Sequence, residues 1–427
     1  MLWKRMLMNP LSIVTKQISG LGVSVTGRMI KRLLFILPLP MLSHLVFSQE
    51  PSSWIGQKVV AKYGHPIKIG EQLVEQHNFH VYTVQRANGD WLWVVSGSKE
   101  GWIPASQVVL FDQAINFYTQ EIAANPGNSW AWAGRGQIWK EKKEYDKAIA
   151  DVNEAIRLDP KYAAAYNNRG NAWSEKKEYD KAIADYNEVI RLDPGIALAY
   201  RNRGAAWQAK KDYDKAIADF NEAIRLDPTD AIAYYNRGNA WQAKKDYDKA
   251  IDDYTEAIRL DPGIAPAYNN RGAAWGAKKD FDKVIADCNE AIRLDPGFAF
   301  AYDNRGNAWR VRKNYDKAIA DYTEAIRLDP KYAYGKLAWL RATRPEESLR
   351  DGKKAIEFAT RGCELTEWKD ANMLGTLAAG YAEVGDFDKA VEWEEKAIQL
   401  YASADDRKKG EERLKLYKDK KPYRETE

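Results

Sequence analysis

The sequence has little histidine and little cysteine, with four of the former and two of the latter among 427 residues. All four histidines lie within the first 80 residues, so the rest of the chain holds no imidazole that could act as a general base. Neither a Ser-His-Asp nor a Cys-His arrangement can be assembled there. The histidines are His44, His65, His77 and His80.

His77 and His80 stand three residues apart in a segment that we expect to be extended. Successive side chains of a strand alternate between its two faces, so residues three apart do not share a face and this pair does not predict a metal site. No glycine-rich loop joins a strand to a helix in the way that phosphate binding needs. We therefore expect no metal and no cofactor.

An excess of charge of one sign is also lacking. Lys and Arg number 65 and Asp and Glu number 61, which gives a formal net charge of +4 with both signs interspersed along the chain. Proteins that bind nucleic acid carry a basic patch or stripe, and this sequence shows none. We expect no nucleic acid among the partners.

Only one long apolar run occurs, at residues 33–46. A membrane-spanning helix needs about 20 apolar residues, and this run is shorter and contains Pro38 and Pro40, which break helices. The run therefore does not predict a membrane-spanning helix of ordinary length.

The same region has the order of a secretory signal. The basic pair Lys31–Arg32 precedes the apolar run, and Val46–Ser48 follows it as a small-residue cleavage site. We predict that residues 1–48 are a signal region cleaved after Ser48, with Met29 as the true start, and that the protein is exported to the periplasm or cell envelope of a bacterium. The alternative that stays open is an uncleaved anchor, which would be the only contact with a membrane.

What the sequence does contain is an internal repeat of 34 residues. The motif RLDP recurs at that interval, and the other features follow in register. If Ser129 is the first position of unit 1, then in units 1 to 6 the fourth position is aromatic, the eighth is Gly and the eleventh is Trp. The eighth positions are Gly136, Gly170, Gly204, Gly238, Gly272 and Gly306, and the eleventh are Trp139, Trp173, Trp207, Trp241, Trp275 and Trp309.

Each unit predicts two helices separated by a polar turn. In AAYNNRGNAWSEK, Tyr166, Gly170 and Trp173 fall on one face at helical spacing, and YDKAIADYNEVIRL repeats this pattern from Tyr179. The glycine has no side chain, which lets two helix backbones approach closely. An Asp-Pro pair ends the second helix, because Pro cannot continue it.

This pattern resembles the tetratricopeptide repeat, whose small and aromatic positions it matches in six units that cover residues 129–332. The resemblance implies an all-α right-handed superhelix, or α-solenoid, in which the first helix of each pair lines the concave surface. Residues 111–128 fit a half repeat, 333–370 a degenerate repeat and 371–404 a further repeat. Residues 405–427 are expected to form a basic capping helix and tail.

Residues 49–110 are rich in alternating β-branched and aromatic residues, which predicts a small β-barrel. In DWLWVV, Trp91 and Trp93 should point one way and Leu92 and Val94 the other. The order of the motifs AKYGH, DWLW and GWIPASQV resembles a Src-homology-3-like (SH3-like) domain. We therefore expect an α+β multidomain protein with an N-terminal SH3-like β-barrel followed by the all-α superhelix.

The SH3 resemblance implies a ligand groove at Tyr63, Trp91 and Pro104. His65 and Gln107 replace two tyrosines of the family and the acidic loop is absent, so the sequence departs from the pattern that binds polyproline. A peptide ligand, a cell-wall glycan and a spacer without a ligand all stay open for this domain.

A second candidate site follows from the second, fifth, sixth, ninth and twelfth positions of each unit, which core packing does not use. The sixth is Asn in units 2 to 6, and a row of amides can hold the backbone of an extended peptide. It is similar to the asparagine ladder in the tetratricopeptide superhelix of O-linked N-acetylglucosamine transferases; the alternative is a soluble surface residue copied by duplication. The predicted groove residues are Asn168, Asn202, Asn236, Asn270 and Asn304, with Asn171, Asn239 and Asn307 at the ninth position and Arg201 and Tyr235 at the fifth.

Two other residue types in the repeats predict structural roles. The seventh-position Arg, Arg169 in unit 2, should pair with an acid of a neighbouring helix such as the recurrent Asp of ADY. Cys288 and Cys363 stand at core positions that other units fill with larger residues, so we expect buried thiols rather than a disulfide.

These observations together predict an exported, non-enzymatic scaffold that binds a protein or peptide segment in its concave groove. Carboxylates recur in every unit on solvated faces, whereas a catalytic pair would be unique. The alternative function is a module for targeting the cell envelope, in which the barrel binds cell-wall material and the repeats act as a spacer.

Overall fold

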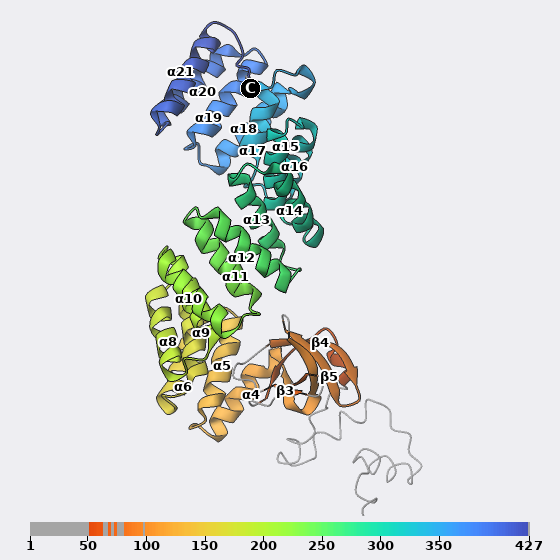
Figure 1. The fold of residues 1–427 in the computed structure, drawn as a ribbon, viewed down its shortest axis with the longest axis vertical. Helices are drawn as coiled ribbons and strands as arrows, with labels where there is room; N and C mark the ends of the chain where they lie inside the picture. The colour runs from red at the N-terminus through yellow and green to blue at the C-terminus, as the bar shows by residue number, and fades with distance from the viewer. Residues whose placement is uncertain (1–50, 63–66, 70–71, 75–80, 97–98, 426–427) are drawn as a thin grey trace, which may run out of the picture. The chain divides into compact units, whose positions relative to one another are not determined.

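The computed structural model describes residues 51–425, except for residues 63–66, 70–71, 75–80 and 97–98. The predicted signal region, Tyr63 and all four histidines lie outside the described residues. The chain divides into two compact units at Ala114, and each is described by itself (Figure 1). No helix in the described part of the chain has the length and apolar character needed to cross a bilayer.

The first compact unit holds a seven-stranded antiparallel sheet, in the order β3-β2-β6-β5-β4-β1-β7. Within the described residues no pairing joins β3 to β7, so the sheet is not closed and the predicted SH3-like barrel is not confirmed. The strands are β1 (Lys58–Ala61), β2 (Ile67–Ile69), β3 (Gln72–Val74), β4 (Val81–Asn88), β5 (Trp91–Ser96), β6 (Lys99–Pro104) and β7 (Val108–Leu110), with short 3-10 helices η1 (Pro51–Trp54) and η2 (Ala105–Gln107).

The alternation predicted for β5 is confirmed. Leu92 and Val94 are buried and belong to the apolar core of the sheet, whereas Trp91 is exposed and Trp93 is half-buried. Trp93 packs edge to face against Trp102 on β6, with ring centroids 5.3 Å apart. One face of the strand thus builds the core, and the other carries the tryptophans.

The second compact unit is an all-α solenoid in which consecutive helices pack side by side in chain order (Figure 1). Eighteen α-helices, α4 to α21, occur among the described residues. The first helices of units 1 to 6 are α5 (Ser129–Glu141), α7 (Ala163–Glu175), α9 (Ala197–Ala209), α11 (Ala231–Ala243), α13 (Ala265–Ala277) and α15 (Ala299–Val311). The second helices are α6 (Tyr145–Leu158), α8 (Tyr179–Leu192), α10 (Tyr213–Leu226), α12 (Tyr247–Leu260), α14 (Phe281–Leu294) and α16 (Tyr315–Leu328).

The remaining helices continue the stack on either side of these units. Helix α4 spans Phe111–Ala124, and α17 (Tyr334–Thr343) is the shortest α-helix among the described residues. It is followed by a 3-10 turn, η3 (Glu347–Leu349). The last helices are α18 (Gly352–Leu365), α19 (Ala371–Glu383), α20 (Phe387–Leu400) and α21 (Ala404–Lys418).

The eighth-position glycines let the two helices of a unit pack closely, as predicted. A Cβ atom on Gly238 would lie 2.8 Å from Cε1 of Tyr254, whose ring fills the space beside the glycine. Unit 5 is looser at this point, because a Cβ on Gly272 would lie 3.6 Å from the sulfur of Cys288. Cys288 is fully buried and is a free thiol, as is Cys363, which confirms the prediction of buried cysteines without a disulfide.

Each turn between the helices of a unit contains a lysine in the left-handed backbone conformation. Lys245 has φ of +64°, in a position where helices commonly end with Gly. The peptide N–H of Lys245 donates to the carbonyl of Gln242 and closes the end of α11. The equivalent residues are Lys143, Lys177, Lys211, Lys279 and Lys313.

Candidate functional site

The seventh-position Arg of each unit joins three helices. In unit 4, Nε and Nη2 of Arg237 donate to the two carboxylate oxygens of Asp253 on α12, at 2.8 and 2.6 Å. Nη1 donates to Oδ1 of Asn221 on α10 of the preceding unit, at 2.7 Å. The arginine therefore binds its own second helix and ties neighbouring units together, which confirms the predicted Arg–Asp pairing.

The same Arg–Asp pair occurs in all six units, at 2.6 to 2.7 Å. The hydrogen bond from Arg203 to Asp219 raises the pKa of that guanidinium above its ordinary value, so it stays charged. The pairs are Arg135–Asp151, Arg169–Asp185, Arg203–Asp219, Arg237–Asp253, Arg271–Asp287 and Arg305–Asp321.

Three of the five predicted sixth-position amides donate hydrogen bonds to the preceding unit. Each bond joins neighbouring first helices, so these amides are held in fixed orientations across the unit boundaries. Their carbonyl oxygens are not used in these bonds. The acceptors are Asn167 and Asn171 for Asn202, Tyr235 and Asn239 for Asn270, and Asn269 for Asn304, at 2.9 to 3.2 Å.

The ninth-position Asn of units 2, 4 and 6 accepts a hydrogen bond from a buried tyrosine of the second helix. The pairs are Tyr186–Asn171, Tyr254–Asn239 and Tyr322–Asn307, at 2.8, 2.7 and 3.0 Å.

In units 3 and 5 the ninth position is Ala205 or Ala273, and the second helix carries Phe220 or Cys288 in place of the tyrosine. Neither Phe nor Cys has a hydroxyl that would need an acceptor. The alternation of Asn and Ala therefore matches the presence and absence of a buried hydroxyl, which gives these three asparagines a structural contact besides the groove role that we predicted.

The two other sixth-position amides differ from these three. Nδ2 of Asn168 is buried without a hydrogen-bond partner, and so is Oε1 of Gln137, which holds the ninth position of the preceding unit. Asn236 is half-buried, and its amide has no hydrogen bond to any described residue. The ninth position before it is the exposed Ala205, which offers no polar atom in its side chain. We call the surface formed by the second, fifth, sixth and ninth positions of the first helices the first-helix face. Asn236 lies on this face, and its polar side-chain atoms are open to a ligand.

Charged residues at the fifth position are paired. Arg201 lies 2.7 Å from Asp230, which also caps α11 by accepting from the backbone of Ile232 and Ala233. The side chain of Tyr235, the other predicted selectivity residue, accepts from Asn270 and packs 6.0 Å from the ring of Tyr254.

Asp303 at the same position of unit 6 pairs with Lys336 of α17, at 2.7 Å. Apolar side chains flank this row at the second position, where Ile232 is 43% exposed and Phe300 is 46% exposed. The first-helix face therefore combines amides, internally neutralised charges and a few exposed apolar groups.

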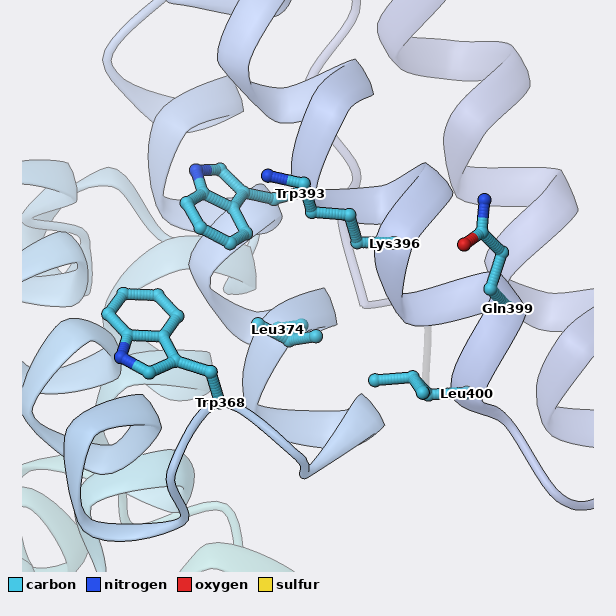
Figure 2. A pocket seen from close by; sticks show the side chains of 6 residues that line it. All are labelled: Trp368, Leu374, Trp393, Lys396, Gln399 and Leu400. Carbon is cyan, nitrogen blue, oxygen red and sulfur yellow. The ribbon is translucent and has the colours of Figure 1, made fainter.

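A separate cavity of about 350 Å³ lies near the end of the solenoid, lined by the turn after α18 and by residues of α19 and α20 (Figure 2). The rings of Trp368 and Trp393 stack at one side of it with centroids 5.1 Å apart, and Leu374 lies beside them. Nζ of Lys396 lies over the Trp393 ring at 4.0 Å and pairs with Glu392. None of the residues predicted as site residues lines this cavity.

In the sheet, Trp91 and Pro104 are cross-strand neighbours on β5 and β6. Trp91 is 43% exposed, so two of the three residues predicted for the SH3-like ligand groove stand together on the surface. The third, Tyr63, lies outside the described residues. Within the described residues no group of three or more His, Cys, Asp and Glu side chains is arranged to hold a metal ion.

Two family models match the helical part of the chain. The model described as tetratricopeptide repeat matches residues 163–195, 231–263, 265–298 and 299–332, and the model described as TPR repeat matches residues 136–177 and 208–245. The comparison with curated proteins returned no match.

The comparison with solved structures returned many matches. MamA is 28% identical over 38% of this chain and 95% of its own, with a TM-score of 0.36. YrrB, described as a TPR protein with an unusual peptide-binding site, is 24% identical over 42% of this chain and 93% of its own, with a TM-score of 0.37. PilF of Pseudomonas aeruginosa is 17% identical over 52% and 95%, with a TM-score of 0.43.

The family matches fall on the paired helices whose glycine, aromatic and Asp-Pro positions were described above. The matched part of the chain consists of tetratricopeptide repeats.

Proposed function

We propose that the chain is a non-enzymatic scaffold whose first-helix face binds an extended segment of a partner protein. The observation that carries this proposal is Asn236, an amide on that face with a free donor and a free acceptor beside the small exposed Ala205. A peptide backbone offers the complementary carbonyl and N–H groups. Ile232 and Tyr235 on the same helix supply apolar surface for a side chain of the bound segment.

The hydrogen bonds among the other amides support this function by preorganisation. Asn202 is already fixed by bonds to the preceding unit, so little side-chain freedom is lost when a ligand reaches its oxygen, whereas Oδ1 of Asn270 already accepts from Nδ2 of Asn269 at 3.2 Å. The fifth-position charges are neutralised within the protein by Asp230 and Lys336. A face with this character suits contacts to the backbone more than contacts to charged side chains.

The test uses peptides selected for binding to the wild-type chain from a displayed random library. We expect Asn236→Ala to weaken the selected peptides at least tenfold, because it removes both polar atoms without removing a bond inside the protein. Thr323→Ala on the exposed side of α16 is the matched control and should leave the affinity unchanged. Equal affinities for wild type and Asn236→Ala, measured by fluorescence anisotropy, would contradict the proposal.

A second candidate function rests on the exposed Trp91 beside Pro104. In this alternative the chain is exported to the bacterial cell envelope, where the sheet domain binds cell-wall material and the repeats act as a spacer. The full chain should then co-sediment with purified cell wall, and Trp91→Ala should abolish co-sedimentation. Co-sedimentation that does not depend on Trp91 would count against this alternative.

A further inference from the structure

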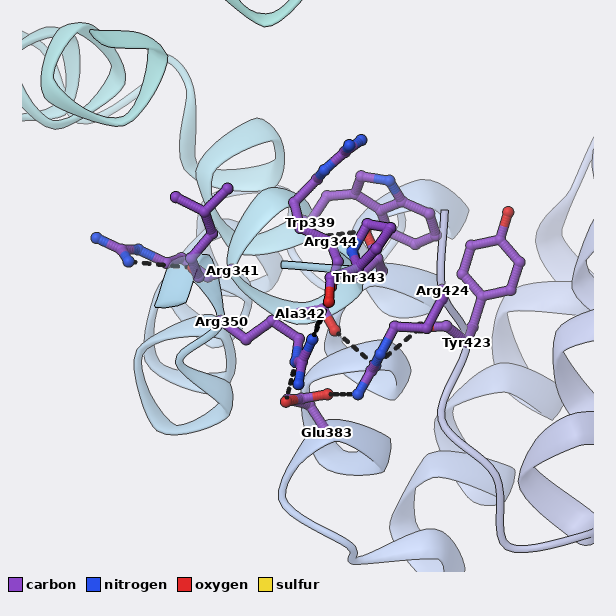
Figure 3. Close-up of polar contacts among 11 residues, drawn as sticks. Trp339, Arg341, Ala342, Thr343, Arg344, Arg350, Glu383, Tyr423 and Arg424 are labelled. Carbon is purple, nitrogen blue, oxygen red and sulfur yellow. Dashed lines mark hydrogen bonds and ion pairs between the residues drawn. The ribbon is translucent and has the colours of Figure 1, made fainter. Parts of the chain in front are cut away.

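The last described residues form an extended segment that crosses the ends of two first helices. Helix α21 ends at Lys418, and the chain then turns at Lys420, whose φ is +55°. From Pro422 it runs past the C-terminal ends of α17 and α19 (Figure 3). We name residues 421–425 the tail segment.

Three consecutive residues of the tail segment contact these helices. The ring of Tyr423 packs against Trp339 of α17, with centroids 5.7 Å apart. Nη2 of Arg424 lies 2.7 Å from the carboxylate of Glu383 at the end of α19.

Glu425 completes the contact through its main chain. Its backbone N–H donates to the carbonyl of Thr343 at 2.9 Å, and its carboxylate lies 3.4 Å from Arg344. One main-chain hydrogen bond, one ring contact, two ion pairs and a 3.4 Å hydrogen bond from Nη1 of Arg424 to the carbonyl of Ala342 thus hold an extended segment, which is a mode by which many peptides are recognised.

Three side chains that the tail segment contacts, those of Trp339, Arg344 and Glu383, also have a partner elsewhere. Glu383 accepts a hydrogen bond from Arg350 at 2.9 Å, so its carboxylate stays paired if Arg424 leaves (Figure 3). The Arg413 guanidinium lies over the Trp339 ring at 5.5 Å. After departure of the tail segment, the acid and the aromatic ring each keep one contact, whereas Oε2 of Glu383 and the carbonyls of Ala342 and Thr343 are left for another segment to bind.

The same holds for Arg344, which is the most buried charge at this place. Its guanidinium lies 3.9 Å from the centroid of the Tyr315 ring and 3.4 Å from Glu346. A buried charge that loses its only partner is strongly destabilising. If Arg344 had no other partner, release of the tail segment would therefore be costly. Here the second partners keep the charged side chains paired in the open state, and only acceptor oxygens are left for a bound segment to satisfy.

We propose that Trp339, Thr343, Arg344 and Glu383 form a second peptide-binding surface, the tail site, which the chain's own tail segment occupies reversibly. The occupant that fits it is an extended partner segment with an aromatic residue, an arginine and an acid in succession. The aromatic residue meets Trp339, the arginine meets Glu383 and the acid meets Arg344. This surface is distinct from the first-helix face around Asn236, and it stands whether or not that face binds a peptide.

The test measures binding of a fluorescent peptide with the sequence KKPYRETE, residues 420–427, by anisotropy. A chain that lacks residues 422–427 should bind it at least tenfold more tightly than the full chain, in which the site is occupied. A peptide with Arg424→Glu should lose at least tenfold in affinity, because it places an acid against Glu383. Asn236→Ala in the shortened chain should leave the affinity unchanged and separates this site from the first-helix face.

A second variant tests the proposal in the full chain, in case the shortened chain does not fold. Tyr423→Ala in the full chain removes the ring contact with Trp339 and keeps the rest of the sequence, and it too should bind the peptide more tightly than wild type does. Equal binding to wild type and to both variants, or no binding to variants that keep their helical circular-dichroism signal, overturns the proposal. Loss of that signal in both variants overturns it as well, because the tail segment is then a fixed part of the last repeats.

Discussion

The fully buried hydroxyl of Tyr322 donates a 3.0 Å hydrogen bond to the side-chain carbonyl of Asn307. Burial raises the pKa of this tyrosine above its ordinary value, so the hydroxyl keeps its proton and acts as a donor. In unit 3 the same two positions hold Ala205 and Phe220, which need no such bond. The repeats thus use two alternative pairs at one place in the core, one polar and one apolar.

We expect the two residues of the polar pair to be energetically coupled. Asn307→Ala leaves the buried hydroxyl of Tyr322 without its acceptor and should cost about 1 to 3 kcal/mol. Tyr322→Phe removes the hydroxyl and should cost about 1 kcal/mol, and the double variant, which recreates the pair of unit 3, should cost less than the sum by about 0.5 to 1.5 kcal/mol. Urea unfolding followed by circular dichroism measures the cycle, and strictly additive losses would argue against the pair.

Much of the fold was predictable because the repeats copy local signals. The Gly and Trp spacing and the Asp-Pro stops placed both helices of each unit, and the Arg–Asp pair followed from an Arg and an Asp that recur at fixed positions of the repeat. The alternation of Leu92 and Val94 with exposed residues was likewise local. Closure of the sheet depends on contacts between distant strands, which alternation does not determine.

The candidate site was less predictable than the fold. The sequence placed Asn171 and Asn202 on one face, but which amide donates to which depends on the offset between neighbouring first helices. The covariation of Asn with Tyr and of Ala with Phe was present in the sequence and could have revealed the tyrosine contacts. No feature of the sequence predicted the contacts of the tail segment, because its partners on α17 and α19 precede it by about 40 to 80 residues.

Arg237 should be more important for stability than any exposed arginine of its unit. Arg237→Ala leaves Asp253 buried without its bidentate partner and breaks the bond to Asn221, so we expect a loss of about 2 to 4 kcal/mol in the free energy of unfolding. Arg237→Lys should recover only part of it, since an ammonium cannot form the two parallel bonds. Arg259→Ala, which removes a solvent-exposed pair with Glu256, is the control and should have no measurable effect in the same urea titrations.

Replacing a turn lysine by glycine should stabilise the solenoid. Lys245 is held at φ of +64°, a conformation that costs a residue with a side chain about 1 kcal/mol relative to Gly. Lys245→Gly should therefore raise the midpoint of thermal unfolding, as should the same change at Lys211. The comparison is Lys244→Gly, one residue earlier, where φ is −79°: glycine relieves no strain there, adds freedom to the unfolded chain and removes the ion pair with Asp214, so the midpoint should fall. A lower midpoint for Lys245→Gly than for wild type would refute the assigned strain.

Both cysteines should be almost unreactive while the protein is folded. Burial raises the pKa of Cys288 to about 12 and that of Cys363 to about 12, and neither side chain is exposed to solvent. At pH 8 only about one thiol in ten thousand would be a thiolate, compared with about a quarter for a thiol of ordinary pKa. Because the thiolate is the nucleophile, labelling by a disulfide reagent at pH 8 should require local or global unfolding of the protein. The labelling rate should therefore increase strongly in urea. The labelling rate of each cysteine, followed by mass spectrometry of its peptide, checks this. Rapid labelling of Cys288 in the native chain would show that the space beside Gly272 admits solvent. Rapid labelling of Cys363 alone would show that the packing between α18 and α19 is loose.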